Sequence, residues 1–156
     1  INKTMKTAGL LVFLSDIHSL GLKNTEGLLH TTSWYWDKDD ASRAFAKKFF
    51  DKTKRMPTDI HAADYSAATN YLKAVAAVKT TDADKVMAYL KSTPINDFYG
   101  KGVIRPDGTF AHDMYLVEAK KPSESTKPWD YLKVLTKLPA DTVWTTKAET
   151  KCALWK

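Results

Sequence analysis

Four histidines and the carboxylates near them are the side chains with which this sequence could carry out chemistry: His18, His30, His61 and His112. Asp16 precedes His18 by two residues, and Asp64 follows His61 by three. An imidazole beside a carboxylate can act as a general acid–base pair. One hypothesis is therefore a small hydrolase-type enzyme that uses one of these two pairs.

The sequence lacks the other common motifs of catalysis and cofactor binding. It has no His-Glu-x-x-His pattern, and its single cysteine, Cys152, cannot form a zinc cluster. It also has no Gly-x-Ser-x-Gly nucleophile turn, and its 6 glycines are not clustered into a phosphate loop or a dinucleotide fingerprint. We therefore expect no catalytic residue, no metal and no cofactor, which leaves recognition as the favoured role.

Hydrogen-bonding groups lie close to aromatic residues at several points of the chain, which is the usual composition of a small-molecule cleft. The candidate ligand-binding residues are Asp16, His18, Trp34, Tyr35, His61 and Tyr65. Each also has a structural interpretation. Asp16 could cap a loop, His61 could satisfy a local backbone group, and Tyr65 could pack along a helix. On composition alone, Trp34 and Trp36 fit a structural role better.

The composition is that of a globular domain. The chain has 156 residues, of which 44% are hydrophobic and 27% are charged, and this length can bury one core. The net charge of +6 raises the question of nucleic acid, but the basic residues alternate with acidic ones and no nucleic-acid motif accompanies them. We therefore expect a solvated basic surface and no nucleic-acid partner. A third hypothesis is an interaction module that uses this basic and aromatic surface.

Two apolar segments near the N-terminus predict strands. The run AGLLVFL, residues 8–14, suits a strand buried on both faces of a parallel sheet, and EGLLHTT, residues 26–32, predicts a second strand. The stretch between them then forms a loop that carries Asp16 and His18, a favoured place for ligand contacts in α/β sheets. The start of the sequence has no initiator Met and no cleavage motif, so we interpret it as the middle of a longer gene product.

The rest of the chain predicts three helices followed by extended segments. A helix capped by Asp39 or Asp40 extends to about residue 52, a second begins at residues 57–58 with an apolar stripe, and a third covers about residues 82–91. Pro-Asp-Gly at 106–108 predicts a hairpin, and residues 128–139 predict a further strand or a short amphipathic helix. The stretch from about Pro139 is expected to be a surface tail or loose strand. The stripe of the second helix comprises Ala68, Tyr71, Leu72 and Val75.

The order of these elements resembles a known family. The stretches GLLVFLSDIHSLGLKNTEGLLHTTSWYWD, FAKKFFDKTKRMPTDIHAADYSAATNYLKAV and INDFYGKGVIRPDGTFAHDMYLVEAKKP are similar to the C-terminal part of periplasmic substrate-binding proteins of the branched-chain amino acid type, which serve ABC importers. Within this family, the sequence is most similar in character to members that look suited to aromatic acids. The resemblance covers about residues 8–155 and depends more on the order of elements than on one motif.

The resemblance implies an α/β fold with two lobes that close over a ligand, with parallel strands flanked by helices and a C-terminal β-hairpin. It implies that residues 1–33 belong to the C-terminal lobe, 34–39 form a hinge crossing, 40–104 belong to the N-terminal lobe, and 105–156 form the hairpin and return segment. Most of the N-terminal lobe would then be missing from this chain. An exchanged homodimer could replace it.

The resemblance also implies a function and site residues. The expected function is capture of a small carboxylate, an aromatic acid or a branched-chain amino acid, in the periplasm for an inner-membrane ABC permease, without catalysis. Asp16 falls where the family's amino-acid binders place an acidic residue that holds the ligand ammonium, and Tyr65 falls where they place a cleft tyrosine. The Asp-Ile-His sequence departs from the family's Glu-Gly pair, which favours an aromatic acid bonded by His18. Trp34 and Tyr35 would form the cleft floor.

Overall fold

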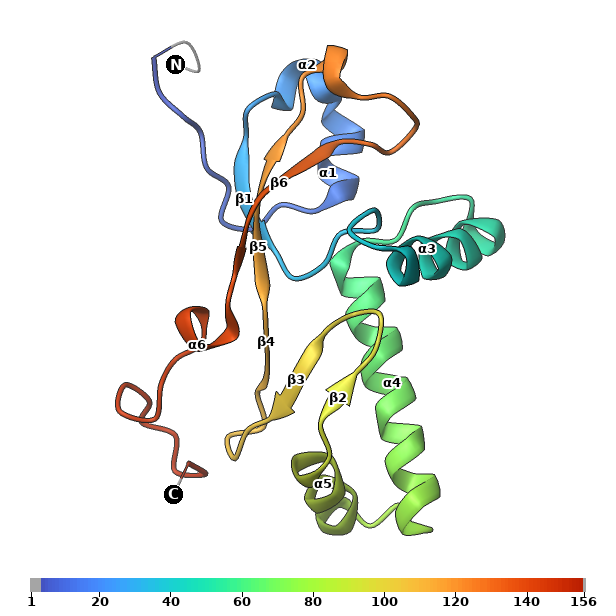
Figure 1. The fold of residues 1–156 in the computed structure, drawn as a ribbon, viewed down its shortest axis with the longest axis vertical. Helices are drawn as coiled ribbons and strands as arrows, with labels where there is room; N and C mark the ends of the chain where they lie inside the picture. Colours follow the sequence, from blue (N-terminus) through green and yellow to red (C-terminus); the bar gives the residue numbers. More distant parts are fainter. Residues whose placement is uncertain (1–3, 156) are drawn as a thin grey trace. The chain divides into compact units, whose positions relative to one another are not determined.

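The structure, a computed structural model, describes residues 4–155 and has the predicted α/β class (Figure 1). The chain divides into two compact units. Unit 1 comprises the residues up to His61 together with Met114–Leu138, and unit 2 comprises Ala62–Asp113 together with the residues from Pro139. None of the helices in the described part of the chain is long and apolar enough to cross a membrane.

Unit 1 is built on a three-stranded sheet with the order β1-β5-β6, in which both pairings are antiparallel (Figure 1). Its strands are β1 (Leu29–Thr32), β5 (Met114–Ala119) and β6 (Leu132–Leu138). The helical elements of unit 1 are α1 (Leu14–Leu20), α2 (Leu22–Thr25), α3 (Asp40–Thr53) and the 3₁₀ turn η1 (Pro122–Glu124). The strands predicted at 26–32 and 128–139 are confirmed as β1 and β6.

The strand predicted over residues 8–14 is wrong beyond a single pairing. Ala8 forms an isolated parallel bridge with Leu29, and Gly9 N–H donates to Leu29 O at 2.8 Å. Leu10 is fully exposed and Leu11 is 77% exposed, whereas the prediction was a strand buried on both faces of a parallel sheet. In the described residues, this bridge is the one parallel pairing, whereas the ladders of the two sheets are antiparallel. The apolar composition of residues 8–14 did not indicate whether neighbouring strands pair with them.

The segment predicted as a loop after that strand contains helices α1 and α2 instead. The carboxylate of Asp16 accepts a hydrogen bond from Phe13 N–H at 2.8 Å, which satisfies a backbone donor at the start of α1. Gly21, with φ of +78°, then ends α1 and begins α2. Both Asp16 and His18 therefore lie on a helix.

Helix α3 begins where the sequence predicted. Asp39 is its N-cap and accepts a hydrogen bond from Ser42 N–H at 2.7 Å. Lys54, in the left-handed region with φ of 57°, ends the helix, and its N–H donates to Phe50 O. The helix is fixed to the core of unit 1 through Ser42, because the indole of Trp34 donates to the Ser42 hydroxyl at 2.9 Å.

Unit 2 contains most of helix α4 (Asp59–Val78), then α5 (Ala83–Ser92), a second three-stranded sheet and the short helix α6 (Ala140–Val143). The sheet has the order β2-β3-β4 and is antiparallel, with strands β2 (Ile95–Asn96), β3 (Lys101–Ile104) and β4 (Phe110–His112). All three predicted helices are thus present. The chain passes from unit 1 to unit 2 within α4, between His61 and Ala62.

The predicted hairpin is confirmed as β3 and β4. Arg105 N–H donates to Thr109 O at 2.9 Å, and the Asp107 carboxylate accepts from Thr109 N–H at 3.0 Å. Gly108 has φ of +88°, a backbone conformation that favours glycine. Gly102 on β3 allows close approach to β4, because a Cβ there would lie 2.0 Å from Ala111 O.

The predicted crossing at residues 34–39 lies inside unit 1, with residues of the same unit on both sides of it. The predicted boundaries therefore do not coincide with the change of unit. The assignment of residues 1–33, 40–104 and 105–156 to lobes stays a prediction. The tail after Pro139 is partly ordered, since it forms α6 and the indole of Trp144 donates to His112 O at 2.7 Å.

Candidate functional site

The aromatic triplet at 34–36 belongs to the core of unit 1. Trp34, Tyr35 and Trp36 are 2%, 5% and 8% exposed. The Tyr35 hydroxyl donates to Trp129 O at 3.3 Å and accepts from Leu132 N–H at 3.4 Å, so it joins two backbone groups. Burial raises the pKa of this hydroxyl well above its ordinary range, with smaller effects from neighbouring hydrogen bonds and carboxylates.

The cavity that Trp34 and Tyr35 line in unit 1 has a volume of about 10 Å³. This is room for about one water molecule and not for an organic ligand. Their contact with a ligand, predicted from the sequence, would need the rings to become accessible, and it stays a prediction. The structural interpretation of the two tryptophans matches their burial.

A larger cavity in unit 1 brings two of the candidate residues together. It has a volume of about 720 Å³, within the range of small-molecule sites, and is called the histidine cavity here because His18 and His61 both line it. Helix α1 contributes His18, Ser15 and Ser19, while the end of α3 and the segment after it contribute most of the other residues. The other lining residues are Phe49, Thr53, Lys54, Arg55, Met56, Thr58 and Trp129.

His18 forms an aromatic wall of the histidine cavity with Trp129. The two rings stack with their centroids 3.9 Å apart and an angle of 16° between their planes. The Nδ1 atom of His18 lies 2.9 Å from the hydroxyl of Tyr131, whose ring is also within 5.8 Å of the imidazole. This hydrogen bond and the stacked indole fix the orientation of the imidazole.

His61 lies at the start of α4, where its Nδ1 atom accepts a hydrogen bond from Thr58 N–H at 3.2 Å. The Thr58 hydroxyl is 2.9 Å from the same nitrogen. An imidazole nitrogen that accepts a backbone N–H carries no proton, so the ring proton of neutral His61 is on Nε2. His61 thus satisfies a local backbone group, as its structural interpretation suggested, and has Nε2–H as a donor.

The charged groups that line the histidine cavity are Lys54 and Arg55, both exposed. No aspartate or glutamate is among the lining residues described. A cavity with cationic side chains, an imidazole donor and aromatic walls favours an organic anion over a cation. The sequence reasoning missed Trp129, Phe49 and Lys54 as site residues, because their proximity to His18 depends on packing between distant segments.

Asp16 is not among the residues that line the histidine cavity. Its carboxylate is used at the start of α1 by Phe13 N–H, which fits its interpretation as a capping residue. The Asp16–His18 acid–base pair, one of the two pairs in the enzyme hypothesis, also lacks a geometric basis. Residues two apart on a helix do not face each other, and the Nδ1 of His18 is bonded to Tyr131.

Tyr65 belongs to unit 2, on the part of α4 beyond the change of unit. Its side chain is 58% exposed, and its ring lies edge-on to Phe98 with the centroids 5.9 Å apart. The role of Tyr65 in ligand contact stays a prediction.

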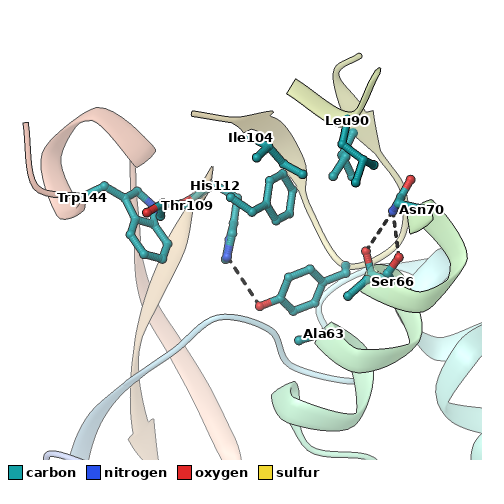
Figure 2. Close-up of a pocket in the computed structure, with 12 residues that line it drawn as sticks. Ala63, Ser66, Asn70, Leu90, Ile104, Thr109, His112 and Trp144 are labelled. Atoms are coloured by element: carbon teal, nitrogen blue, oxygen red, sulfur yellow. Dashed lines mark hydrogen bonds between the residues drawn. The ribbon is translucent and has the colours of Figure 1, made fainter. Parts of the chain in front are cut away.

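Unit 2 has a cavity of its own, of about 390 Å³, and none of the six candidate residues lines it (Figure 2). Ser66 and Asn70 meet there in hydrogen bonds that also involve Asp97, with Ser66 Oγ donating to the Asp97 carboxylate at 2.6 Å. Tyr99 Oη lies 3.5 Å from His112 Nε2. Burial lowers the pKa of His112 despite the opposing effect of the Asp113 carbonyl and carboxylate. These polar groups are already bonded to one another, and the rest of the lining is largely apolar.

Among residues 4–155, no group of three or more His, Cys, Asp or Glu side chains is arranged to hold a metal ion.

Comparison with known proteins identifies the family. The family model of periplasmic binding proteins matches residues 1–126, so the chain belongs to this family. A comparison with curated proteins gives no match. The family match thus confirms the periplasmic binding protein class, which the order of elements in the sequence had suggested.

Solved structures of periplasmic proteins are similar over nearly the whole chain. A periplasmic binding protein from Burkholderia mallei is 59% identical, with a TM-score of 0.95. The match includes 99% of this chain and 41% of the Burkholderia mallei chain. A branched-chain amino acid ABC transporter periplasmic ligand-binding protein from Burkholderia xenovorans is 42% identical, with a TM-score of 0.93 and the same coverage. An amino acid ABC transporter substrate-binding protein from Pseudomonas fluorescens, 23% identical with a TM-score of 0.86, shares the fold. The chain therefore spans about two fifths of the length of these structures.

Proposed function

We propose that this chain is part of the solute-binding component of an ABC importer, and that the histidine cavity contributes to binding a small carboxylate. Membership of the periplasmic binding protein family supports the general role. The observation that carries the site is the meeting of His18, stacked on Trp129, with His61 around a cavity of about 720 Å³. The protein would act in the periplasm, deliver its ligand to an inner-membrane permease and catalyse no reaction.

An aromatic acid is the ligand class that fits the lining best. The parallel rings of His18 and Trp129 and the edge-on rings of Phe49 and His61 offer surface for a planar ring. The Nε2–H of His61 can donate to a carboxylate, and the ammonium of Lys54 adds positive charge. The cavity thus offers aromatic surface for the ring of an aromatic acid and positive or donating groups for its carboxylate.

A branched-chain amino acid is the second candidate, because the similar Burkholderia xenovorans protein is a periplasmic ligand-binding protein of a branched-chain amino acid ABC transporter. An α-amino acid brings an ammonium group, which requires an acceptor such as a carboxylate. The carboxylate of Asp16, the residue expected to supply it, is bonded to Phe13 N–H and does not line the histidine cavity. This difference favours the aromatic acid.

Thermal-shift titration with benzoate, 4-hydroxybenzoate and leucine tests the proposal. The titration uses the 156-residue chain and a chimera in which this chain replaces the matching 41% of the Burkholderia mallei protein. A ligand at 100 times its Kd that binds only the folded state stabilises it by about 2.7 kcal/mol. We expect the aromatic acids to raise the unfolding temperature of the chimera more than leucine does. No stabilisation by any of the three at high excess contradicts the proposal.

Substitutions locate the site within unit 1. We expect His61→Gln and Lys54→Gln each to weaken binding of the aromatic acid by about tenfold, the effect of losing one charge-assisted hydrogen bond or charge. Lys48→Gln is the matched control, because Lys48 is exposed on α3 and does not line the cavity. Equal affinity in all three variants would show that the ligand binds elsewhere.

A further inference from the structure

Two residues that line the histidine cavity have an unusual backbone conformation. Among residues 4–155, the residues other than glycine with a left-handed backbone are Lys54, Lys79 and Trp129, with φ of 57°, 55° and 67°. Because this conformation brings Cβ close to the following carbonyl oxygen, glycine is the residue that normally occupies it. For a bulky side chain such as tryptophan it is a genuine outlier. Both Lys54 and Trp129 line the cavity, so a cation and an aromatic ring stand where glycine would relieve backbone strain.

Contacts on both sides of Trp129 hold its backbone in this conformation. Its carbonyl oxygen accepts hydrogen bonds from the indole N–H of Trp36 at 3.0 Å and from the Tyr35 hydroxyl at 3.3 Å. The next residue, Asp130, is buried, and its carboxylate pairs with the ammonium of Lys120. Backbone strain persists only where the surrounding structure fixes it, and such strain is concentrated at functional sites. The conformation of Trp129 therefore points to a role for its side chain.

The side chain of Trp129 supplies the flat surface of the cavity. Its indole stacks on the imidazole of His18 with the ring centroids 3.9 Å apart, and both rings line the cavity. An indole face attracts another aromatic ring through its π-system as well as by burial of apolar area. A saturated ring of similar size lacks the first of these attractions. Trp129 can thus distinguish a planar aromatic ligand from a saturated one.

Lys54 presents its charge from the end of α3, at a position where helices commonly have glycine. Its ammonium donates to Asp51 O at 2.9 Å. An ammonium has three donors, so it can bind a ligand carboxylate as well. Lys79 provides a close comparison, because it directly follows the end of α4, has nearly the same φ and is exposed. Lys79 does not line the histidine cavity.

We infer that Lys54 and Trp129 are specificity-determining residues whose side chains are kept on a left-handed backbone because they contact the ligand. Trp129 selects a planar ring and Lys54 selects an anion. This inference rests on the proposed function, which assigns the cavity to a small carboxylate. It adds that the site lowers the stability of the folded chain. Glycine at Lys54 should therefore raise stability and lower affinity together, whereas loss of a purely structural residue lowers stability.

The first test compares Lys54→Gly with Lys79→Gly. Thermal unfolding of the 156-residue chain gives the midpoint, and calorimetric titration of the chimera with benzoate gives the Kd. We expect both variants to raise the midpoint by roughly 1–4 °C, because each relieves a left-handed backbone. Lys54→Gly should also weaken benzoate binding by about tenfold, whereas Lys79→Gly should leave the Kd within about twofold.

The second test compares Trp129→Ala with Trp129→Gly, using benzoate and cyclohexanecarboxylate as ligands. Both variants lose the indole, so each should reduce the preference for benzoate over cyclohexanecarboxylate by about tenfold. The glycine variant should nevertheless unfold roughly 2–4 °C above the alanine variant, because alanine retains the Cβ that strains the backbone. At an ordinary position the alanine variant is the more stable of the two.

Each contrary result has a distinct meaning. If Lys54→Gly leaves the Kd for benzoate unchanged, or lowers the midpoint, the inference is wrong for Lys54. If Trp129→Ala leaves the preference between the two carboxylates unchanged, it is wrong for Trp129, although the proposed function still stands. If the parent chimera binds neither carboxylate, the proposed function fails and this inference fails with it. If the Trp129 variants do not fold, the comparison of Lys54→Gly with Lys79→Gly still decides.

Discussion

Unit 1 and unit 2 differ in how completely they bury their apolar residues. Unit 1 encloses Trp34, Ile17 and Val117 and has a large cavity that is lined by two histidines and two cations. Unit 2 buries mostly small or medium side chains, whereas Leu72 and Tyr71 remain exposed on α4. The difference shows that one unit can enclose its large apolar side chains while the other leaves such side chains on the surface of a helix. Hydrophobic free energy is gained only where opposing surface is present.

Trp34→Ala should have the largest effect, because it removes a fully buried ring and its hydrogen bond to Ser42 from the better packed unit. We expect a loss of about 3–5 kcal/mol in the free energy of unfolding. Denaturant unfolding followed by circular dichroism measures it. Leu135→Ala on β6, where the side chain is 40% exposed, is the control and should cost far less. A loss below about 1 kcal/mol for Trp34→Ala would remove the contrast between the units.

Ala74→Leu probes the buried face of α4 in unit 2. Ala74 is 0% exposed, so the added atoms must displace neighbours, which costs about 1–3 kcal/mol. The same denaturant experiment gives the value. Ala77→Leu, at an exposed position on the same helix, should be close to neutral. If Ala74→Leu stabilises the chain instead, the small-residue face has spare room and unit 2 is more loosely packed than its burial indicates.

Tyr35→Phe tests the hydroxyl that connects Trp129 O and Leu132 N–H in unit 1. Loss of these two long hydrogen bonds should lower the free energy of unfolding by about 1 kcal/mol while the ring keeps its packing. Ligand affinity, measured in parallel with benzoate, should remain that of the parent chain. A selective loss of affinity would instead make Tyr35 a ligand contact, as predicted from the sequence, and would require its ring to become accessible.

The pH dependence of stability should come from one buried histidine in each unit and should be the smallest of these effects. Burial lowers the pKa of His30 in unit 1, against the raising effects of Asp59 and Asp16, and burial likewise lowers the pKa of His112 in unit 2. Both are therefore less readily protonated in the folded chain than in the unfolded chain. The unfolded state takes up protons first as the pH falls below about 6.5, so stability decreases with acidification.

Denaturant unfolding at pH 7 and pH 5 measures this decrease in the parent, His30→Gln and His112→Gln. Each substitution should reduce the acid-induced loss, because the side chain that protonates on unfolding is gone. The carboxylates with lowered pKa, such as Asp130 beside Lys120, act only at lower pH and do not interfere. If only His30→Gln reduces the loss, His112 does not contribute to the acid sensitivity, and the contrast between the units becomes sharper.

Local signals in the sequence were enough for most helices and strands. Asp39 capped α3 as expected, Pro-Asp-Gly turned the β3–β4 hairpin, and residues 128–139 supplied β6. The strand prediction for residues 8–14 was wrong because a short apolar stretch does not determine which elements pack around it. Leu10 and Leu11 are exposed. The apolar stripe of α4 correctly predicted a helix, but its large residues face solvent here.

The candidate site was predictable only in part. His18 and His61 were chosen from the sequence as hydrogen-bonding groups near aromatic residues, and both line the histidine cavity. Trp129, which stacks on His18, lies 111 positions further along the chain, so no spacing rule connects the two. Lys54 and Arg55 looked like ordinary surface charge, because their approach to the cavity depends on where α3 ends.

The sequence by itself determined the α/β class, the helices after residue 39, the hairpin and, through the order of its elements, the family. These features depend on caps, turn residues and periodicity, which act between neighbours in the chain. Only the tertiary structure decided that the rings at 34–36 are buried, that His18 and His61 share a cavity, and that the stripe of α4 faces solvent. Such properties depend on surfaces brought together from distant parts of the chain, and burial exists only where those surfaces meet.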